Sequence, residues 1–244
     1  MKWFPPRKRT KIYVIALVAG VLLSVVVWWS LQPSYHGKSL EWWLEQANQG
    51  TWDDRSLDAS SESVTQAVLH VGQRAVPTLL KMLKDEHPRW KGKLEAWTGS
   101  VERLPTIHFQ DRSRIVNNAA IIGFAILKKK ADNALPELRS MLHDTNTCQR
   151  AAEALRAIGP QTIPLLLEGT TNNEPAIRSW SAYALASFET SAPMLSERMW
   201  ALRQDTNEMV ASYAWSWLFL HETQNVDIAR EALRDGRRFP VGIA

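Results

Sequence analysis

The sequence has little of the chemistry that a metal site or a nucleophilic enzyme needs. It contains one cysteine, Cys148, in 244 residues, which excludes an internal disulfide framework and any multi-thiolate metal site. Glycine and proline are modest at 11 and 12 residues, so the chain is neither fibrous nor disordered. It has no glycine-rich phosphate loop, nucleophile elbow or Ser/His/Asp signature. We therefore expect no catalytic residue, no cofactor site and no metal site.

The residues that could hold a metal or act as a nucleophile have simpler interpretations. The six histidines show no pairing at i and i+4 and no His-Glu-x-x-His, whereas a metal needs converging donors. Asp53, Asp54 and Asp58 lack the spacing of a calcium loop. Cys148 follows Asn146 closely, near an expected helix start where the dipole can lower a thiol pKa. No histidine lies close to it in sequence, and we interpret it as inert.

Basic charge is concentrated at the start of the chain. The net charge is +4, but removing the five lysines and arginines of residues 1–11 from the total of 29 leaves 24 basic against 25 acidic side chains. Binding along a nucleic-acid backbone needs a concentrated basic stripe, so we expect no nucleic-acid partner. Two small basic clusters, Lys128–Lys130 and Arg234–Arg238, are interpreted as solvated helix ends, with contact to anionic lipid or a polyanion as the alternative.

One long apolar stretch predicts a membrane anchor. Ile12–Leu31 carries no charge over twenty residues, which as a helix spans about 30 Å, enough to cross the hydrocarbon core. A cleaved signal peptide is the alternative, but the exit Val27–Leu31 contains two tryptophans and is too bulky for a cleavage site. Basic residues precede the stretch, which places residues 1–11 in the cytoplasm and residues 32–244 outside it.

The body of the chain repeats a pattern with a period of about 28 residues. Apolar residues, Gly, Pro and Leu-Leu fall at identical offsets in Ala67–Leu80 and Ala154–Leu167, and degraded copies centre on Pro136 and Pro193. Such a period indicates stacked helical pairs. Glycine suits the end of a first helix and proline the first turn of a second. In the copies around Pro136 and Pro193 the glycine position holds Lys128 and Glu189.

These signals predict an all-α chain in five parts. They are a basic tail at 1–11, a transmembrane helix at 12–31, an amphipathic helix and linker at 32–61, an α-solenoid of helical pairs at 62–238, and a tail at 239–244. The amphipathic helix is expected at 39–49, with Leu40, Trp43, Leu44 and Ala47 on one face. The pairs are expected at 62–73 with 75–85, 112–129 with 132–143, 147–158 with 161–169, 174–188 with 191–203, and 208–222 with 226–235. An insert at 87–111 is expected to hold an extra helix at 90–103.

The repeat pattern resembles the HEAT-repeat superfamily. The segment Tyr35–Leu44, which reads Tyr-His-Gly-Lys-Ser-Leu-Glu-Trp-Trp-Leu, further resembles an opening segment of membrane-anchored HEAT-repeat proteins from planctomycete- and verrucomicrobia-like bacteria. The resemblance covers most of residues 35–205. It implies an armadillo-type α-solenoid in the bacterial inner membrane with a periplasmic body, and it carries over no catalytic residue.

Tryptophan is the unusual residue of this chain, with 12 copies. Trp180 and Tyr183 share a helix face away from the apolar stripe of their helix, and Trp215 and Trp217 lie two apart, so they cannot fill one core face. Core packing between repeats is the favoured interpretation for most of these aromatic residues, but an exposed tryptophan is a common anchor of protein interfaces. The candidate partner-binding residues are Trp180, Trp200, Trp215 and Trp217.

The function predicted from the sequence is a membrane-tethered scaffold that binds a protein partner without catalysis. One alternative is an enzyme or a lyase-like accessory subunit, because HEAT-like modules occur in phycobilin lyases. A less favoured alternative is a nucleic-acid binder similar to the HEAT-like alkylpurine glycosylases, which requires a cytoplasmic body and a basic groove.

Overall fold

The computed structural model describes residues 33–47, 59–84, 112–189 and 193–221, together with the isolated positions Tyr13, Leu17 and Gly20. In these ranges the regular structure is helical apart from one short hairpin, which confirms the all-α class. The tails, the insert 87–111, the last expected helix at 226–235 and the rest of the expected span at 12–31 lie outside the described residues. Within the described part, no helix has both the length and the apolar character needed to cross a membrane.

A two-stranded hairpin that the sequence analysis did not predict opens the described chain. Strands β1 (Ser34–Tyr35) and β2 (Lys38–Ser39) pair antiparallel. The two residues between them, His36 and Gly37, have φ of 49° and 73°. Positive φ at both central positions characterises a type I′ turn, whose twist matches that of paired strands.

The hairpin packs on the first two helices. Trp43 of α2 (Leu40–Ala47) donates its indole Nε1–H to the carbonyl oxygen of Tyr35 at 3.0 Å. The Tyr35 ring lies 5.2 Å, centroid to centroid, from the ring of His70 on α3 (Ala59–Val71). The ammonium of Lys38 lies 3.4 Å from the centre of the Trp42 ring, a distance typical of a cation–π contact. The hairpin thereby covers this end of the helical array.

Within the described residues, the first four predicted helical pairs and the first helix of the fifth form, and each described end lies within three residues of its expected position. Three of the turns inside pairs contain 3-10 helices: η1 (Gly72–Ala75), η2 (Lys128–Ala134) and η3 (Pro160–Thr162). The pairs are α3 (Ala59–Val71) with α4 (Val76–Lys84), α6 (Arg112–Leu127) with α7 (Leu135–Leu142), α8 (Cys148–Ile158) with α9 (Ile163–Gly169), and α10 (Pro175–Ala186) with α11 (Pro193–Leu202); α12 (Glu208–His221) follows.

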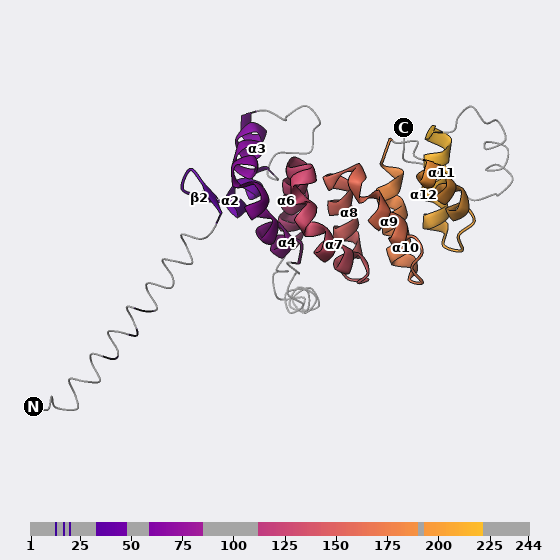
Figure 1. Ribbon diagram of the computed structural model, residues 1–244, viewed down its shortest axis with the longest axis horizontal. Coiled ribbons are helices and arrows are strands. Elements are labelled where there is room, and N and C mark those ends of the chain that lie inside the picture. The colour runs from indigo at the N-terminus through magenta and orange to yellow at the C-terminus, as the bar shows by residue number, and fades with distance from the viewer. Residues whose placement is uncertain are drawn as a thin grey trace, which may run out of the picture.

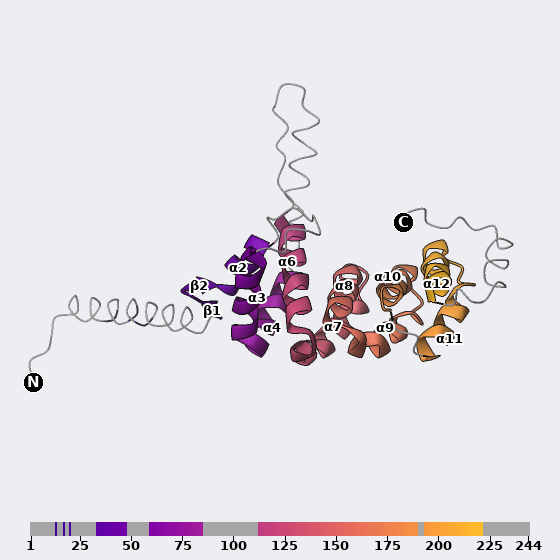
Figure 2. The same ribbon diagram turned by 90° about the horizontal axis from the view of Figure 1, so that it is seen from above.

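The pairs follow one another along the long axis of the molecule (Figure 1). Seen from above, α6, α8, α10 and α12 lie on one side, the first row, and α7, α9 and α11 on the other, the second row (Figure 2). Contacts join α6 to α8, α8 to α10 and α10 to α12 within the first row, and α7 to α8, α9 to α10 and α11 to α12 between rows. A continuous apolar core extends between them from Leu40 to Leu218.

The turn after the first helix keeps a positive φ in three pairs. Gly72 has φ 59° and Gly159 has φ 121°, and Lys128 takes the corresponding place with φ 47°. The pair that contains Lys128 has three more residues between this position and its proline, and η2 accommodates them as a longer 3-10 segment. The turn therefore keeps its positive φ at this position even where lysine stands in place of glycine.

The first turns of the helices contain the expected prolines, but only some of the helices have an asparagine cap. Pro136 and Pro164 lie in the first turns of α7 and α9, as expected. Asn207 caps α12, because its Oδ1 accepts the backbone N–H two residues later at 3.0 Å. Asn146 and Asn173 stand before α8 and α10 as Asn207 stands before α12, but neither caps its helix, since α8 and α10 begin without a side-chain cap. Residues slightly earlier in these loops bind the loop backbone instead.

Candidate functional site

Helix α10 carries two partly exposed aromatic rings beside its buried stripe, and one of them, Trp180, also packs against the core. Ile177, Ala184 and Leu185 are buried, whereas Trp180 and Tyr183 are partly exposed. The two rings meet edge to face with their centroids 5.6 Å apart, a favoured geometry for aromatic pairs. This confirms that Trp180 and Tyr183 share a face, but Trp180 is not separate from the core, because its ring packs against it.

Two neighbouring helices complete a cluster around Tyr183. The Tyr213 ring of α12 lies 5.4 Å from the Tyr183 ring, centroid to centroid. The guanidinium carbon of Arg156, on α8, lies 5.9 Å from the centre of the same ring. We call Arg156, Trp180, Tyr183 and Tyr213 the Tyr183 cluster. It joins three successive helices of the first row into one surface.

Several polar groups of the Tyr183 cluster have no partner inside the described ranges. The Nε atom of Arg156 is buried and makes no hydrogen bond. The hydroxyls of Tyr183 and Tyr213 and the indole N–H of Trp180 likewise make no hydrogen bond to a described residue. Burial, with the nearby Tyr183, raises the pKa of Tyr213, so its hydroxyl stays neutral. The cluster therefore combines the apolar surface of its rings with several N–H and O–H groups that have no hydrogen-bond acceptor among the described residues.

Two of the four candidate tryptophans belong to the core instead of the surface. Trp217 is 1% exposed and donates its Nε1–H to the carbonyl oxygen of Phe188 at 3.1 Å, and Trp215 is 4% exposed. Helix α12 packs against both α10 and α11, so side chains that point in different directions from it are both covered. This corrects the expectation that Trp215 and Trp217 offer exposed rings to a partner.

The fourth candidate, Trp200, is partly exposed on α11. The guanidinium carbon of Arg203 lies 4.8 Å from the centre of its ring, and Arg203 Nη1 donates to the Trp200 carbonyl oxygen at 2.6 Å. The chain's own cation therefore contacts this ring. Trp180 lies on a first-row helix and Trp200 on a second-row helix, so the two exposed candidates occupy different sides of the array.

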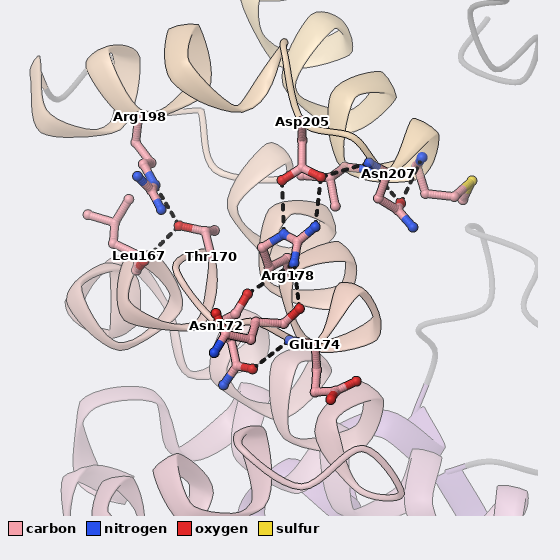
Figure 3. A network of polar contacts seen from close by, with 11 residues as sticks. Leu167, Thr170, Asn172, Glu174, Arg178, Arg198, Asp205 and Asn207 are labelled. Carbon is pink, nitrogen blue, oxygen red and sulfur yellow. Dashed lines mark hydrogen bonds and ion pairs between the residues drawn. The ribbon is translucent and has the colours of Figure 1, made fainter.

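A buried ion pair fixes α10 against the loop that leads into α12 (Figure 3). Arg178 donates to both carboxylate oxygens of Asp205 at 2.9 Å, with both side chains largely buried. Its Nη1 also donates to the carbonyl oxygens of Asn172 and Asn173 at 3.0 and 2.9 Å. Bidentate pairing of this kind adds geometric specificity. It sets the relative position of the helices that carry Tyr183 and Tyr213.

A second contact in the same region joins the C-terminal end of α9 to the middle of α11 (Figure 3). Arg198 of α11 donates its Nε–H to the hydroxyl oxygen of Thr170 at 2.7 Å, and that hydroxyl donates to the Leu167 carbonyl oxygen at 2.7 Å. Thr170 is buried, so this hydroxyl satisfies both its donor and acceptor capacity inside the protein. The two contacts together make the α9–α12 region a rigid support for the cluster.

Arg156 was missed by the sequence analysis although a signal for it exists. Arg156 and Tyr183 are each the ninth residue of their helices, α8 and α10. Residues at equal positions in successive pairs of a repeat lie side by side. When successive repeats of the sequence are aligned, Arg156 therefore falls beside Tyr183. A search for aromatic residues alone does not find Arg156.

Among the described residues, the remaining candidate sites show no convergent chemistry, and Asp53, Asp54 and Asp58 lie outside the described ranges. A groove of about 850 Å³ lies among α2, α4, α6 and α7, but its charges pair with one another, as Lys81 with Glu41 and Lys84 with Glu137. Cys148 is 1% exposed, and burial raises its thiol pKa above the ordinary value, so the lowering by a helix dipole is outweighed. Within the described ranges, no three His, Cys, Asp or Glu side chains are placed to hold a metal ion.

Comparison with known proteins identifies no family for this chain. No protein-family model matches its sequence. No curated protein and no solved structure matches it either. The resemblance to HEAT-repeat proteins therefore stays a prediction, and the functional argument depends on the described residues themselves.

Proposed function

We propose that this chain is a membrane-tethered helical-repeat scaffold that binds a protein partner and carries out no catalysis. The observation that carries the proposal is the Tyr183 cluster, where partly exposed rings from α10 and α12 adjoin the guanidinium of Arg156. Trp, Tyr and Arg are the residue types enriched at the energetic centres of protein interfaces. Rings held by packing against neighbouring helices lose little conformational freedom when a partner binds.

We infer that the helical array is an α-solenoid of the HEAT type. Its support is the succession of helical pairs in two rows, the positive-φ turn shared by three pairs, and the prolines that open second helices. In a solenoid each pair buries apolar surface mainly against its neighbours, which leaves long faces open for binding. The Tyr183 cluster occupies one such face.

We further infer that residues 12–31 anchor the array in a bacterial inner membrane, with residues 1–11 in the cytoplasm and the body in the periplasm. The support for this inference is the uncharged apolar stretch and the basic residues before it. A tether confines encounters to the membrane surface and raises the effective concentration of partners held there. The interface can then remain modest in area.

A photo-crosslinking experiment in the native host tests the binding surface. We would place benzoylphenylalanine at Ser179, which is partly exposed on α10 beside Trp180, and in a separate protein at Glu197, which is exposed on the second-row helix α11. We expect a discrete crosslinked adduct from position 179 and none from position 197.

A double variant makes the crosslinking test specific to the cluster. Trp180→Ala together with Tyr213→Ala should reduce the adduct from position 179 at least tenfold, because truncating hot-spot side chains typically costs over 1 kcal/mol each. Lys129→Gln, at an exposed position far along the chain, serves as the control and should leave the adduct unchanged. Equal adducts from positions 179 and 197, or an adduct indifferent to the double variant, would contradict the proposed function.

A further inference from the structure

The chemistry of the Tyr183 cluster indicates what kind of partner it fits, an inference that rests on the proposed function. Arg156 is a permanent cation, because a guanidinium is not deprotonated in proteins. Its contact with a described residue is the ring of Tyr183. Its Nε is buried and without a hydrogen bond, but the side chain as a whole is partly exposed, so a binding partner would reach the guanidinium through its other N–H groups.

Nearby acidic side chains do not supply that partner within the described residues. Glu153, one turn earlier on α8, accepts a hydrogen bond from the side-chain amide of Gln149 at 3.2 Å, and no ion pair joins it to Arg156. Elsewhere in the array arginines do find carboxylates, as Arg178 with Asp205 and Arg139 with Glu168. Arg156 differs from these two arginines, because its contact is with a ring and not with a carboxylate.

The other polar groups of the cluster point to the same kind of ligand. The indole N–H of Trp180 is a donor only, and the two tyrosine hydroxyls are neutral groups that donate or accept. None of the three is bonded to a described residue. A surface with this set of groups is complementary to oxygen acceptors that carry negative charge, presented next to an apolar side chain that can lie against the rings.

We propose that the Tyr183 cluster binds an acidic peptide segment of the partner, with an Asp or Glu carboxylate on Arg156 and an adjacent apolar side chain against Trp180 and Tyr213. A carboxylate matches the fork of N–H groups on a guanidinium. One cation among neutral rings favours a single carboxylate over a nucleic acid or polyphosphate, because polyanion binding requires several cations in a row.

The test uses the full chain in lipid nanodiscs and a phage-displayed library of random twelve-residue peptides as the probe. We compare selections on the wild type, on Arg156→Gln and on Lys129→Gln, which removes the same charge at an exposed site outside the cluster. Thermal unfolding of each variant establishes that it is folded. The wild type and Lys129→Gln should enrich Asp or Glu beside an aromatic or aliphatic residue, and Arg156→Gln should not.

The best peptide then gives a quantitative measurement. Replacing its acidic residue by the corresponding amide should weaken binding to the wild type roughly tenfold and binding to Arg156→Gln less than twofold, since a charge-assisted hydrogen bond outside bulk water is of that order. Arg156→Lys should retain part of the preference for the acidic peptide over its amide counterpart, because lysine keeps the positive charge but lacks the planar set of guanidinium N–H groups.

The outcomes separate the two proposals. Peptides that bind through Trp180 and Tyr213 without an acidic preference overturn the acidic-segment inference and leave the proposed function intact. Preference for a phosphorylated peptide over its glutamate counterpart overturns the carboxylate assignment in favour of phosphate. If no selected peptide loses affinity in the Trp180→Ala, Tyr213→Ala variant, both the inference and the proposed surface fail.

Discussion

Lys128 holds a backbone conformation that suits glycine. Its φ of 47° places it in the left-handed region, like Gly72 at 59° in the corresponding turn. A side chain in this region costs about 1 kcal/mol or more, because Cβ approaches the following carbonyl oxygen. The surrounding helices α6 and α7 determine the conformation of the turn, and Lys128 adopts the unfavourable positive φ that this conformation requires.

Lys128→Gly should therefore raise the free energy of unfolding by about 1 kcal/mol. Gly72→Ala should lower it by a similar amount, since space is open around Gly72 and only the backbone resists. Gly159→Ala should cost more, about 2 kcal/mol, because φ 121° with ψ −170° is nearly restricted to glycine. Urea unfolding of the full chain in detergent measures all three, and Lys129→Gly, without a positive φ, should gain nothing.

The buried indole of Trp217 gives a second prediction at this scale. Trp217→Phe removes the donor to the Phe188 carbonyl oxygen and leaves a void beside it. We expect a loss of about 2 to 3 kcal/mol in the free energy of unfolding. Trp180→Phe, at a partly exposed ring, should change it by less than about 0.5 kcal/mol. Comparable losses at both positions would show that Trp180 is not a surface residue.

At the scale of helices, the Arg178–Asp205 pair should make the α10–α12 junction sensitive to acid. The guanidinium of Arg178, through its hydrogen bonds, holds the pKa of Asp205 below its ordinary value of 3.8. A carboxyl whose pKa is lower in the folded state contributes stability that is fully present above the unfolded value. That contribution is lost as the pH falls through the folded value.

Asp205→Asn should accordingly lower the free energy of unfolding by about 3 kcal/mol at pH 7, because it leaves a buried guanidinium without its charge partner. The difference between wild type and variant should shrink as the pH falls below about 4. Urea unfolding between pH 7 and pH 2.5 measures it. Glu168→Gln, at the exposed pair with Arg139, is the control and should cost less than about 1 kcal/mol. A pH-independent difference would refute the assignment.

The helices were predictable from sequence because period, glycine and proline act locally and agree with one another. The hairpin was not, because its strands are two residues long and its turn begins with His36. The burial of both Trp215 and Trp217 also escaped prediction. Spacing along one helix tells which residues share a face, and only the neighbouring helices decide how many faces of α12 are covered.

The candidate site was predictable at two of its positions and not as a whole. Trp180 and Tyr183 stand out in the sequence as two aromatic residues three positions apart on α10. Their meeting with Tyr213 and Arg156 depends on the lateral register of three helices, which the Arg178–Asp205 pair helps to set. Such contacts between distant segments depend on tertiary packing, and local propensity carries no information about them.

For the whole molecule, the proposed topology makes a prediction that two fusions at Ala244 can check. Alkaline phosphatase is active only after export and green fluorescent protein fluoresces only when it folds in the cytoplasm. The proposed orientation, drawn from the basic residues before Ile12, has the body outside the cytoplasm, so the phosphatase fusion should be active and the fluorescent fusion dark. Deleting residues 1–31 should reverse both signals. An inactive phosphatase with a bright fluorescent fusion would place the body in the cytoplasm.

The long η2 turn has a practical consequence. It absorbs three extra residues between Lys128 and Pro136 while α6 and α7 keep their places among the helices on either side. Its first three side chains are exposed. A short epitope or a small fluorophore-binding tag inserted there would sit in the middle of the array and leave both chain ends free. Such an internal label would allow the orientation of the array against the membrane to be followed in living cells.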